Sequence, residues 1–225
     1  MRQKSVLITG CSSGIGRCLA LGLHARGYRM FASVKQEKDI AALRAAGLES
    51  LVLDLRSTES IRAAVDEVLA RSGGELYALI NNGAYGQPGA VEDLTRAALR
   101  LQFETNLFGT QELTNRVLPV MRARNAGRIV QISSLLGIVC MGYRGAYNAS
   151  KFALEALSDT LRLELRGTNI QIVLVEPKLY FDSLQPGSIA TEAINAKASA
   201  LQIDAAHGLK LGQTGLECWF DAVVC

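Results

Sequence analysis

Short apolar runs alternate with longer amphipathic stretches along most of this 225-residue chain. The apolar runs lie at residues 5–9, 28–34, 50–54, 77–80, 128–133 and 170–176. Runs of this length are typical of buried parallel strands, because helices cover both faces of a parallel sheet. The stretches between the runs follow a helical period. Six strands alternating with helices predict an α/β fold with a doubly wound parallel sheet in a single domain.

The amphipathic stretches predict helices with identifiable ends. The first helix is expected to follow the glycine-rich turn after the first strand and to end near Gly27. The others are expected at 37–46, 57–71, 95–123 and 147–166. Ser57 is the expected N-cap of the helix that it precedes. Pro119 is expected to break or kink the long helix that contains it.

The chain divides into a core and a less regular C-terminal segment. Residues 1–177 hold all six predicted strands and form the core. Residues 178–225 are interpreted as an atypical, substrate-side segment of the same domain, with a turn at 185–188 and a helix at 189–206. No convincing further strand is predicted there.

A glycine-rich turn joins the first strand to the first helix, with the sequence Gly-Cys-Ser-Ser-Gly-Ile-Gly at residues 10–16. Gly10 permits a tight turn, Gly14 lets a pyrophosphate approach the backbone, and Gly16 lets the helix pack on the strand. The helix N-terminus offers free N–H groups and a positive dipole end to phosphates. The turn therefore predicts a Rossmann-type dinucleotide site.

Residues at the ends of the next strands bear on which dinucleotide binds. The second strand is followed by Lys35, and no carboxylate lies at its end. A carboxylate at this position would bind the ribose hydroxyls and repel a 2′-phosphate. The lack of a carboxylate therefore favours NADP(H) over NAD(H), although Lys35 also fits an ordinary surface loop. Asp54 ends the third strand, where an acid could bind the adenine amino group or serve as a turn residue. Residues 81–84 end the fourth strand, a place where ligands bind in open parallel sheets.

Tyr147 and Lys151 are four residues apart on a predicted helix, so they share one face. A nearby cation lowers the pKa of a phenol from about 10, and such a Tyr can exchange a proton with a carbonyl or alcohol oxygen. A helix-edge Tyr and a solvated Lys would give the same spacing. Asn106 lies among apolar residues and must satisfy its amide if buried; a surface Asn is the alternative.

Composition narrows the function further. The net charge of +3, from 24 basic and 21 acidic residues that are interspersed, gives no indication of nucleic-acid binding. The five cysteines have no disulfide or metal-site spacing, so free thiols in a reducing cytoplasm are expected. The apolar run at 6–8 is too short for a signal peptide, and no run approaches the roughly 20 residues of a bilayer span. We therefore expect a cytoplasmic protein without a metal site.

Together these motifs resemble the classical short-chain dehydrogenases/reductases (SDR) over residues 4–177. Residues 9–16 match the T-G-x-x-x-G-x-G turn of that family, and residues 81–84 resemble N-N-A-G with the last two residues exchanged. Asp54 matches the adenine-contacting acid. The residues that match the catalytic set are Asn106, Ser134 (with Ser133 as the less favoured choice), Tyr147 and Lys151.

The resemblance implies an NAD(P)(H)-dependent oxidoreductase that interconverts an alcohol and a carbonyl on a small molecule. Tyr147 would be the acid in reduction and the base in oxidation, Lys151 would lower its pKa and hold the nicotinamide ribose, and Ser134 would bind the substrate oxygen. Asn106 would place a water between Lys151 and solvent. The cofactor-binding residues would be Gly10, Ser12, Ser13, Gly14, Ile15, Gly16, Lys35, Asp54, Asn82, Gly83, Tyr147, Lys151 and Pro177. Helices 95–123 and 147–166 would pair between subunits in a homodimer or homotetramer.

Two features leave alternatives open. After Pro177 the family usually has Gly and then a Thr, where this chain has Lys178 and Asp182. A catalytically impaired nucleotide-binding regulator or sensor is therefore the alternative function; a flavodoxin-like or methyltransferase domain would not explain Tyr147 and Lys151. The apolar residues at 135–143 favour a hydrophobic steroid-, retinoid- or fatty-type substrate, but sheet and interface packing would explain them equally.

Overall fold

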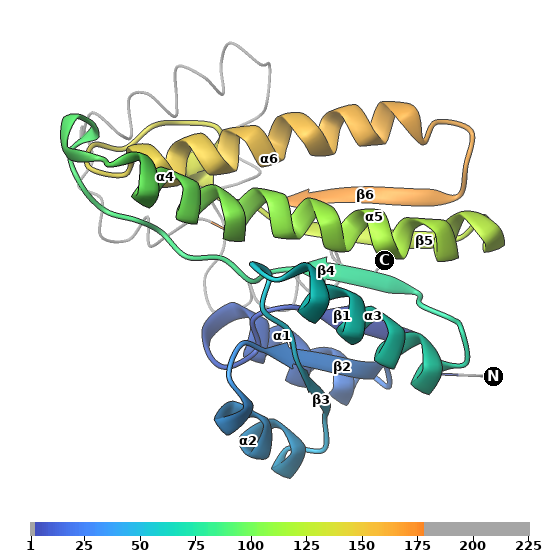
Figure 1. Cartoon of the computed structure of the whole chain (residues 1–225). Helices are drawn as coiled ribbons and strands as arrows, with labels where there is room; N and C mark the ends of the chain where they lie inside the picture. Colours follow the sequence, from blue (N-terminus) through green and yellow to red (C-terminus); the bar gives the residue numbers. More distant parts are fainter. Residues whose placement is uncertain (1–2, 178–225) are drawn as a thin grey trace.

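A fully parallel six-stranded sheet of order β3-β2-β1-β4-β5-β6 forms the centre of the structure (Figure 1). The structure is a computed structural model, and it describes residues 3–177. The strands are β1 (Ser5–Ile8), β2 (Arg29–Val34), β3 (Glu49–Val52), β4 (Ala78–Asn81), β5 (Gly127–Ile132) and β6 (Ile170–Val175). The strand order reverses between β1 and β4, which confirms the predicted doubly wound, Rossmann-type sheet.

The helices are α1 (Gly14–Ala25), α2 (Ile40–Ala45), α3 (Thr58–Ser72), α4 (Arg96–Phe103), α5 (Gly109–Arg124) and α6 (Gly145–Glu164). The predicted cap of α3 is confirmed, because Ser57 Oγ accepts a hydrogen bond from the Ser60 amide at 3.1 Å. Gly73, at φ 73°, then ends this helix in the left-handed conformation.

Of the two outcomes predicted at Pro119, a break or a kink, the break is wrong. Helix α5 runs through Pro119 without interruption. The long helical stretch is instead divided by a π-helical turn, Glu104–Phe108, which carries Asn106. The start of α5 also lies very close to the loop after β3, since a Cβ on Gly109 would be 1.8 Å from the Leu55 carbonyl oxygen. Widened turns of this kind concentrate at functional sites, and the sequence period does not reveal them.

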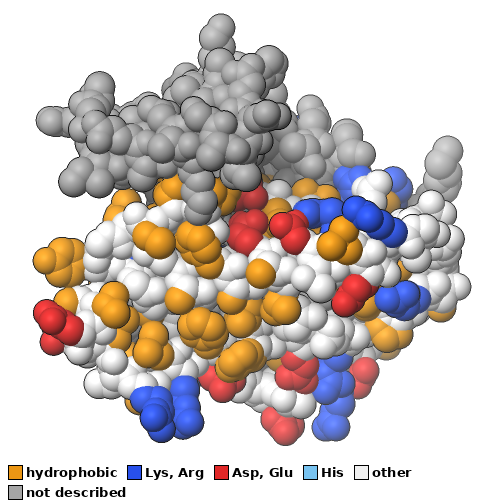
Figure 2. Space-filling model, turned by 90° about the horizontal axis from the view of Figure 1, so that it is seen from above, with side chains coloured by type: hydrophobic (Ala, Val, Ile, Leu, Met, Phe, Trp, Pro, Cys, Tyr) orange, Lys and Arg blue, Asp and Glu red, His pale blue; other side chains and the backbone are white. Residues whose placement is uncertain are grey.

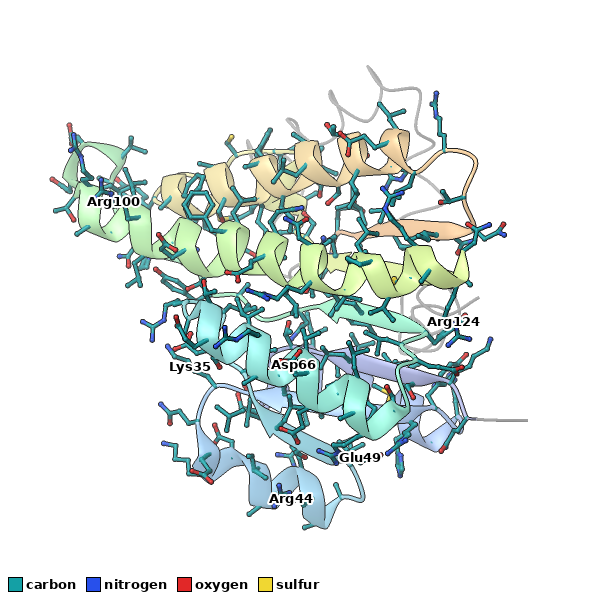
Figure 3. The ribbon with its side chains drawn as sticks, turned by 45° about the vertical axis from the view of Figure 1, so that its right-hand side comes forward. Lys35, Arg44, Glu49, Asp66, Arg100 and Arg124 are labelled. Atoms are coloured by element: carbon teal, nitrogen blue, oxygen red, sulfur yellow. The ribbon has the colours of Figure 1, made fainter. Side chains whose placement is uncertain are left out.

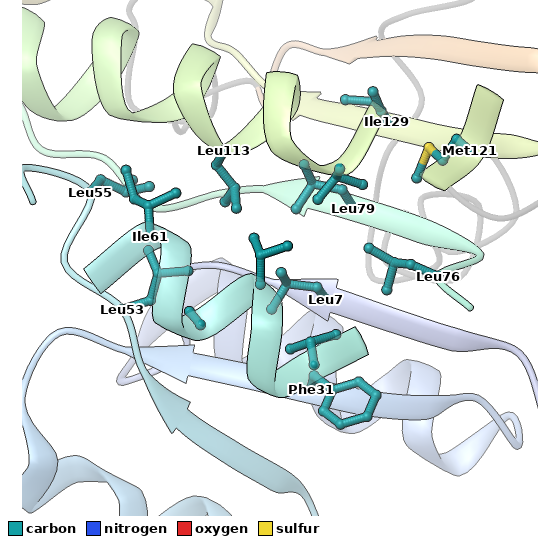
Figure 4. Packing of buried hydrophobic residues seen from close by; sticks show 14 of the residues in the cluster. Leu7, Phe31, Leu53, Leu55, Ile61, Leu76, Leu79, Leu113, Met121 and Ile129 are labelled. Atoms are coloured by element: carbon teal, nitrogen blue, oxygen red, sulfur yellow. The ribbon is translucent and has the colours of Figure 1, made fainter. Parts of the chain in front are cut away.

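Two apolar clusters hold the sheet between its helices. Val6 and Ile8 of β1 face α1 and α2, whereas Leu7 faces α3 and α5. The second cluster fills the layer between the sheet and α3, α5 and α6. Figure 4 shows the part of this cluster that lies against α3 and α5. Because both faces of each central strand are buried, the strands appear as continuous apolar runs in the sequence.

Residues 178–225 lie outside the described residues. The structure therefore does not test the predictions made for them, which are the turn at 185–188, the helix at 189–206 and the replacements at Lys178 and Asp182. In the part of the chain that is described, no helix combines the length and the apolar character needed to cross a bilayer.

An ion-pair network joins three elements at the amino-terminal edge of the sheet, opposite Lys35 (Figure 3). Glu49 of β3 accepts hydrogen bonds from Arg29 of β2 and from Arg71 of α3, the latter at 2.6 Å. Arg29 also donates to the Arg71 carbonyl oxygen at 2.9 Å. The hydrogen bond from Arg29 is the main reason that the pKa of Glu49 is lowered.

Glu49→Gln should lower the free energy of unfolding by about 1–2 kcal/mol, since it removes the charge from three hydrogen bonds, two from Arg29 and one from Arg71. Because the folded-state pKa of Glu49 is depressed, its contribution is present above the unfolded-state pKa and is lost as the pH falls through the folded-state value. Urea titration at several pH values measures both effects. Glu67→Gln, which affects only an exposed i,i+4 pair with Arg71, is the matched control and should cost no more than about 0.5 kcal/mol. Equal losses in the two variants would contradict the network's role.

Candidate active site

The glycine-rich turn presents free backbone donors at the carboxyl edge of the sheet. Gly10 adopts φ 73°, and Cys11 N–H bonds to the Ser33 carbonyl oxygen at 2.8 Å, which fixes the turn against β2. Ser13 precedes α1, and its side chain makes no capping bond. The amides of the first turn of α1 therefore lack intrahelical partners and suit a phosphate group.

Gly16 lies where no side chain fits. A Cβ there would be 2.3 Å from the Gly10 carbonyl oxygen and 2.4 Å from Asn82 Nδ2. Gly14 contrasts with it, since a Cβ on Gly14 would meet nothing within 4 Å, although its φ of 57° still favours glycine. The sequence predicted that Gly14 lets a pyrophosphate approach and that Gly16 lets the helix pack, and both roles stay predictions.

A set of hydrogen bonds ties the turn after β1 to the turn after β4. Thr9 Oγ1 accepts from the amides of Asn82 at 2.9 Å and Gly83 at 2.8 Å. In return, Asn82 Nδ2 donates to the carbonyl oxygens of Thr9 at 2.9 Å and Gly10 at 3.1 Å. We call these four bonds the Thr9–Asn82 lock. The side chain of Asn82 thus holds the glycine-rich turn in place.

A cleft of about 660 Å³ runs along this edge. The predicted cofactor residues Gly10, Ser12, Ser13, Gly14, Ile15, Lys35, Asp54, Asn82 and Gly83 line it. Gly16 is packed beneath the turn, and Tyr147, Lys151 and Pro177 are not among the lining residues. The sequence prediction missed the lining residues Thr9, Leu53, Leu55, Arg56, Ala84, Tyr85, Leu101 and Thr105. Thr9 and Ala84 belong to the motifs at 9–16 and 81–84, and this was the available signal for these two residues.

Charged side chains gather at the end of the cleft formed by β2 and β3. Arg56 donates to Asp54 from Nε at 3.2 Å and from Nη2 at 2.8 Å. These bonds, with a smaller effect of Lys35, lower the pKa of Asp54 and keep it ionised. Asp54 lies two residues beyond β3 and is a cleft residue that also forms an ion pair within its own turn.

Lys151 is buried, which excludes the alternative of a solvated lysine. Its side chain is 2% exposed, and Nζ donates to the Ile132 carbonyl oxygen at the end of β5 at 2.7 Å. Nζ also lies 5.7 Å from the centre of the Tyr147 ring, as expected for two residues on one helix face. Burial lowers the pKa of Lys151 to about 8.

In this structure Lys151 is not among the groups that shift the pKa of Tyr147, although the sequence predicted that it would lower this pKa. Burial of the phenol raises its pKa, and the opposing effects come from a hydrogen bond with Ser134 and from the charge of Arg144. The reason is geometric: the Lys151 ammonium bonds to the backbone of β5 and not to the phenol oxygen. Tyr147 is therefore held in its protonated form, beside Ser134.

Asn106 is also buried, at 1% exposure, so the surface alternative is excluded. Its Oδ1 accepts from the Tyr85 amide at 3.1 Å, while Nδ2 donates to the Tyr85 carbonyl oxygen at 2.8 Å and to Ser150 Oγ at 3.2 Å. The π-helical turn thus joins the loop after β4 to α6. A Cβ on Gly86, in the same loop, would lie 3.3 Å from the Tyr147 ring, so this loop packs against the phenol.

Comparison with known proteins establishes the family. The sequence profile described as "short chain dehydrogenase" matches residues 4–197, and the chain belongs to this family. It is 45% identical over 175 residues to the uncharacterized oxidoreductase YbbO of Escherichia coli, covering 78% of this chain and 65% of that protein. It is 37% identical to 3-ketodihydrosphingosine reductase of Bacteroides thetaiotaomicron, covering 79% and 64%. The chain therefore spans less than two thirds of the length of these two relatives.

Solved structures share the fold. The actinorhodin polyketide ketoreductase with NADPH superposes with a TM-score of 0.78 at 26% identity, covering 99% of this chain and 90% of that one.

Gly16→Ala tests the packing beneath the turn. The added methyl group collides with the Gly10 carbonyl oxygen and the Asn82 amide, so the turn must shift, and dinucleotide binding should weaken at least about tenfold. Gly142→Ala is the matched control, because a Cβ there meets nothing within 4 Å and its φ is not in the left-handed region. Fluorescence titration with NADPH compares the two variants. Unchanged affinity in Gly16→Ala would contradict the packing.

Proposed function

We propose that this chain is part of an NADP(H)-dependent oxidoreductase that interconverts an alcohol and a carbonyl on a small hydrophobic molecule. The observation that carries the proposal is the grouping of Ser134, Tyr147 and Lys151 at the carboxyl end of β5, on the same edge of the sheet as the cleft. The four residues that match the catalytic set are all buried or half-buried there. This gives the alternative of an impaired nucleotide sensor no support.

The residues present fit a dinucleotide. Because Gly16 has no side chain, the turn can pack closely on the start of α1, and the first amides of α1 are free to hold a pyrophosphate. When bound, the nicotinamide group would supply or accept the hydride. Lys35 lies in the cleft, and β2 ends without a carboxylate, so a 2′-phosphate would meet positive charge there. The related ketoreductase structure contains NADPH, which supports the same choice.

The chain's own groups would handle the proton. Burial raises the pKa of Tyr147, so the phenol keeps its proton at neutral pH and can donate it to a carbonyl oxygen. The Ser134 hydroxyl, 2% exposed and hydrogen-bonded to Tyr147, would orient that same oxygen. Lys151, with its pKa lowered to about 8, would hold the nicotinamide ribose. Asn106 would place a water that links Lys151 to solvent, and its side chain already fixes the loop that packs on Tyr147.

Residues 135–143, the apolar segment after β5, contain both buried side chains that pack in the core and exposed side chains that could contact a substrate. Leu136 and Val139 are 5% and 7% exposed and belong to the core. Met141 and Tyr143 are 40% and 74% exposed, and they lie just before the helix that carries Tyr147. These two side chains would contact a hydrophobic substrate. One relative is named as a reductase of a keto compound, which favours a carbonyl substrate for this chain as well.

We also propose a homodimer or homotetramer. Large apolar side chains are exposed on α4, on the π-helical turn and on α6: Leu101, Phe108, Leu157 and Leu163. Figure 2, which looks onto the α6 side, shows hydrophobic side chains gathered on this face. Exposed apolar patches mark protein–protein interfaces, so we take these side chains as the candidate subunit interface.

Tyr147→Phe should lower the rate of NADPH oxidation with apolar aldehydes and ketones by about 10²–10⁴-fold, because the proton donor is lost. NADPH affinity, measured in parallel, should change little. Tyr28→Phe is the matched control, since Tyr28 packs on Tyr77 near the opposite edge of the sheet and should leave the rate intact. If Tyr147→Phe turns over as fast as the wild type, the proposed acid is wrong.

Lys35→Ala should weaken NADPH binding about 10-fold or more, as expected for loss of one charged hydrogen bond to a phosphate, and NADH binding less than about twofold. Lys38→Ala, on the exposed short helix that follows, removes the same charge nearby and should change neither affinity. Parallel titrations of both dinucleotides measure the difference. Equal weakening for NADPH and NADH would show that Lys35 does not read the 2′-phosphate.

A further inference from the structure

One face of α6 contacts two consecutive residues at the end of β5. Lys151 donates to the Ile132 carbonyl oxygen at 2.7 Å. Glu155 follows Lys151 by four residues and therefore lies on the same face, and its carboxylate lies beside Ser133, whose hydroxyl favours its ionised form. A Cβ on Gly137 would be 2.9 Å from Ser133 Oγ and 3.1 Å from Glu155 Oε1. The two oxygens thus converge beneath the turn that follows Ser134, and the proposed reaction uses neither of them.

These two oxygens are buried. Ser133 is 3% exposed, and neither its Oγ nor Glu155 Oε1 forms a well-oriented hydrogen bond with any described residue. A buried carboxylate oxygen without a hydrogen bond is costly unless a nearby charge compensates it. Lys151, one helical turn away and itself 2% exposed, is the buried cation on this face.

The remaining charges around Glu155 come from two elements. On α6, Asp159 is exposed and pairs with Arg162, which also donates to the Ile172 carbonyl oxygen of β6 at 3.2 Å. At the end of β6, Glu176 adds a second half-buried carboxylate. Burial raises the pKa of Glu155, Glu176 and Asp159 raise it further, and Ser133 and Lys151 lower it. Glu155 and Lys151 therefore favour each other's charged forms.

We propose that Glu155 is a positioning residue for Lys151: its carboxylate is the counter-charge that keeps the buried ammonium protonated at the end of β5, and it thereby sets the upper pH limit of the reaction. The coupling rests on the placement of both groups on one face of α6 at the end of β5, and on the effect that each charge has on the other. The effect on the reaction rests, in addition, on the proposed function.

The sign of the effect follows from electrostatics. A negative charge nearby favours the ammonium form, so its removal in Glu155→Gln leaves burial unopposed and lowers the pKa of Lys151 below its present value of about 8. Glutamine has nearly the same shape, and the buried Oε1 has no hydrogen bond to lose, so the fold should persist.

Carbon NMR of the lysine side chains measures the Lys151 titration directly, in the full chain and without cofactor. The chain has seven lysines, so selective labelling gives a simple spectrum, and Lys151→Met assigns the signal. We expect the pKa of Lys151 to fall by about 0.5 or more in Glu155→Gln. Asp159→Asn is the matched control: it removes a negative charge one turn further along the same face, but this charge is exposed and already paired. It should shift the pKa by less than about 0.2.

The coupling must also be reciprocal, which gives a second and independent variant. In Lys151→Met the pKa of the Glu155 carboxyl should rise by the same amount, measured by carboxyl-carbon NMR. A Lys151 pKa that is unchanged in Glu155→Gln, or a Glu155 pKa that is unchanged in Lys151→Met, overturns the proposal; if one variant does not fold, the other decides.

The pH dependence of kcat/KM extends the test to the reaction. If the chain turns over, the alkaline limb of the profile should move to lower pH in Glu155→Gln and stay in place in Asp159→Asn. A coupling seen by NMR with an unmoved alkaline limb overturns the role in setting the pH limit. Absence of turnover in the wild type counts against the proposed function, while the NMR titrations still decide whether Glu155 is the counter-charge.

Discussion

The Thr9–Asn82 lock is the constraint on which the candidate site depends. It joins the turns after β1 and β4, the two neighbouring strands between which the strand order reverses. In this lock, the Thr9 hydroxyl accepts hydrogen bonds from two backbone amides, and the Asn82 side-chain amide donates to two carbonyl oxygens. Gly16 must then lack a side chain, since its Cβ would occupy the space of the Asn82 amide. The crevice at this reversal point is where ligands bind in open α/β sheets.

Burial of Lys151 and Tyr147 is the second physical feature that determines the properties of the site. Lys151 is almost completely removed from solvent, and its ammonium bonds to the end of β5. The same burial raises the pKa of Tyr147, so the phenol is held as a proton donor in the structure without cofactor. The acid–base character of the site is therefore set by α6 packing on the end of β5 as much as by the identity of the two residues. Glu155, one helical turn after Lys151, is a further, half-buried titratable group of α6 at the end of β5.

The sequence predicted best what depends on local pattern. All six strands, the Ser57 cap and the glycine-rich turn follow from apolar period, capping chemistry and glycine geometry, and the structure contains them. It predicted less well what depends on distant partners. The helix continues through Pro119, and the interruption near Asn106 arises where that side chain reaches the loop after β4. The direction of the Tyr147 pKa shift depends first on burial of the phenol, which residue spacing does not specify.

Titration of NADPH into the full chain, followed calorimetrically for the wild type and for Asn82→Ala, tests the central claim most directly. The account predicts saturable binding at one site per chain in the wild type and a loss of at least about tenfold in affinity in the variant, whose turn after β1 loses two hydrogen bonds. Circular dichroism of the variant shows whether its sheet persists. NADPH binding of equal strength in both proteins would contradict the claim that the Thr9–Asn82 lock builds the dinucleotide site, as would a wild-type chain that binds no NADPH.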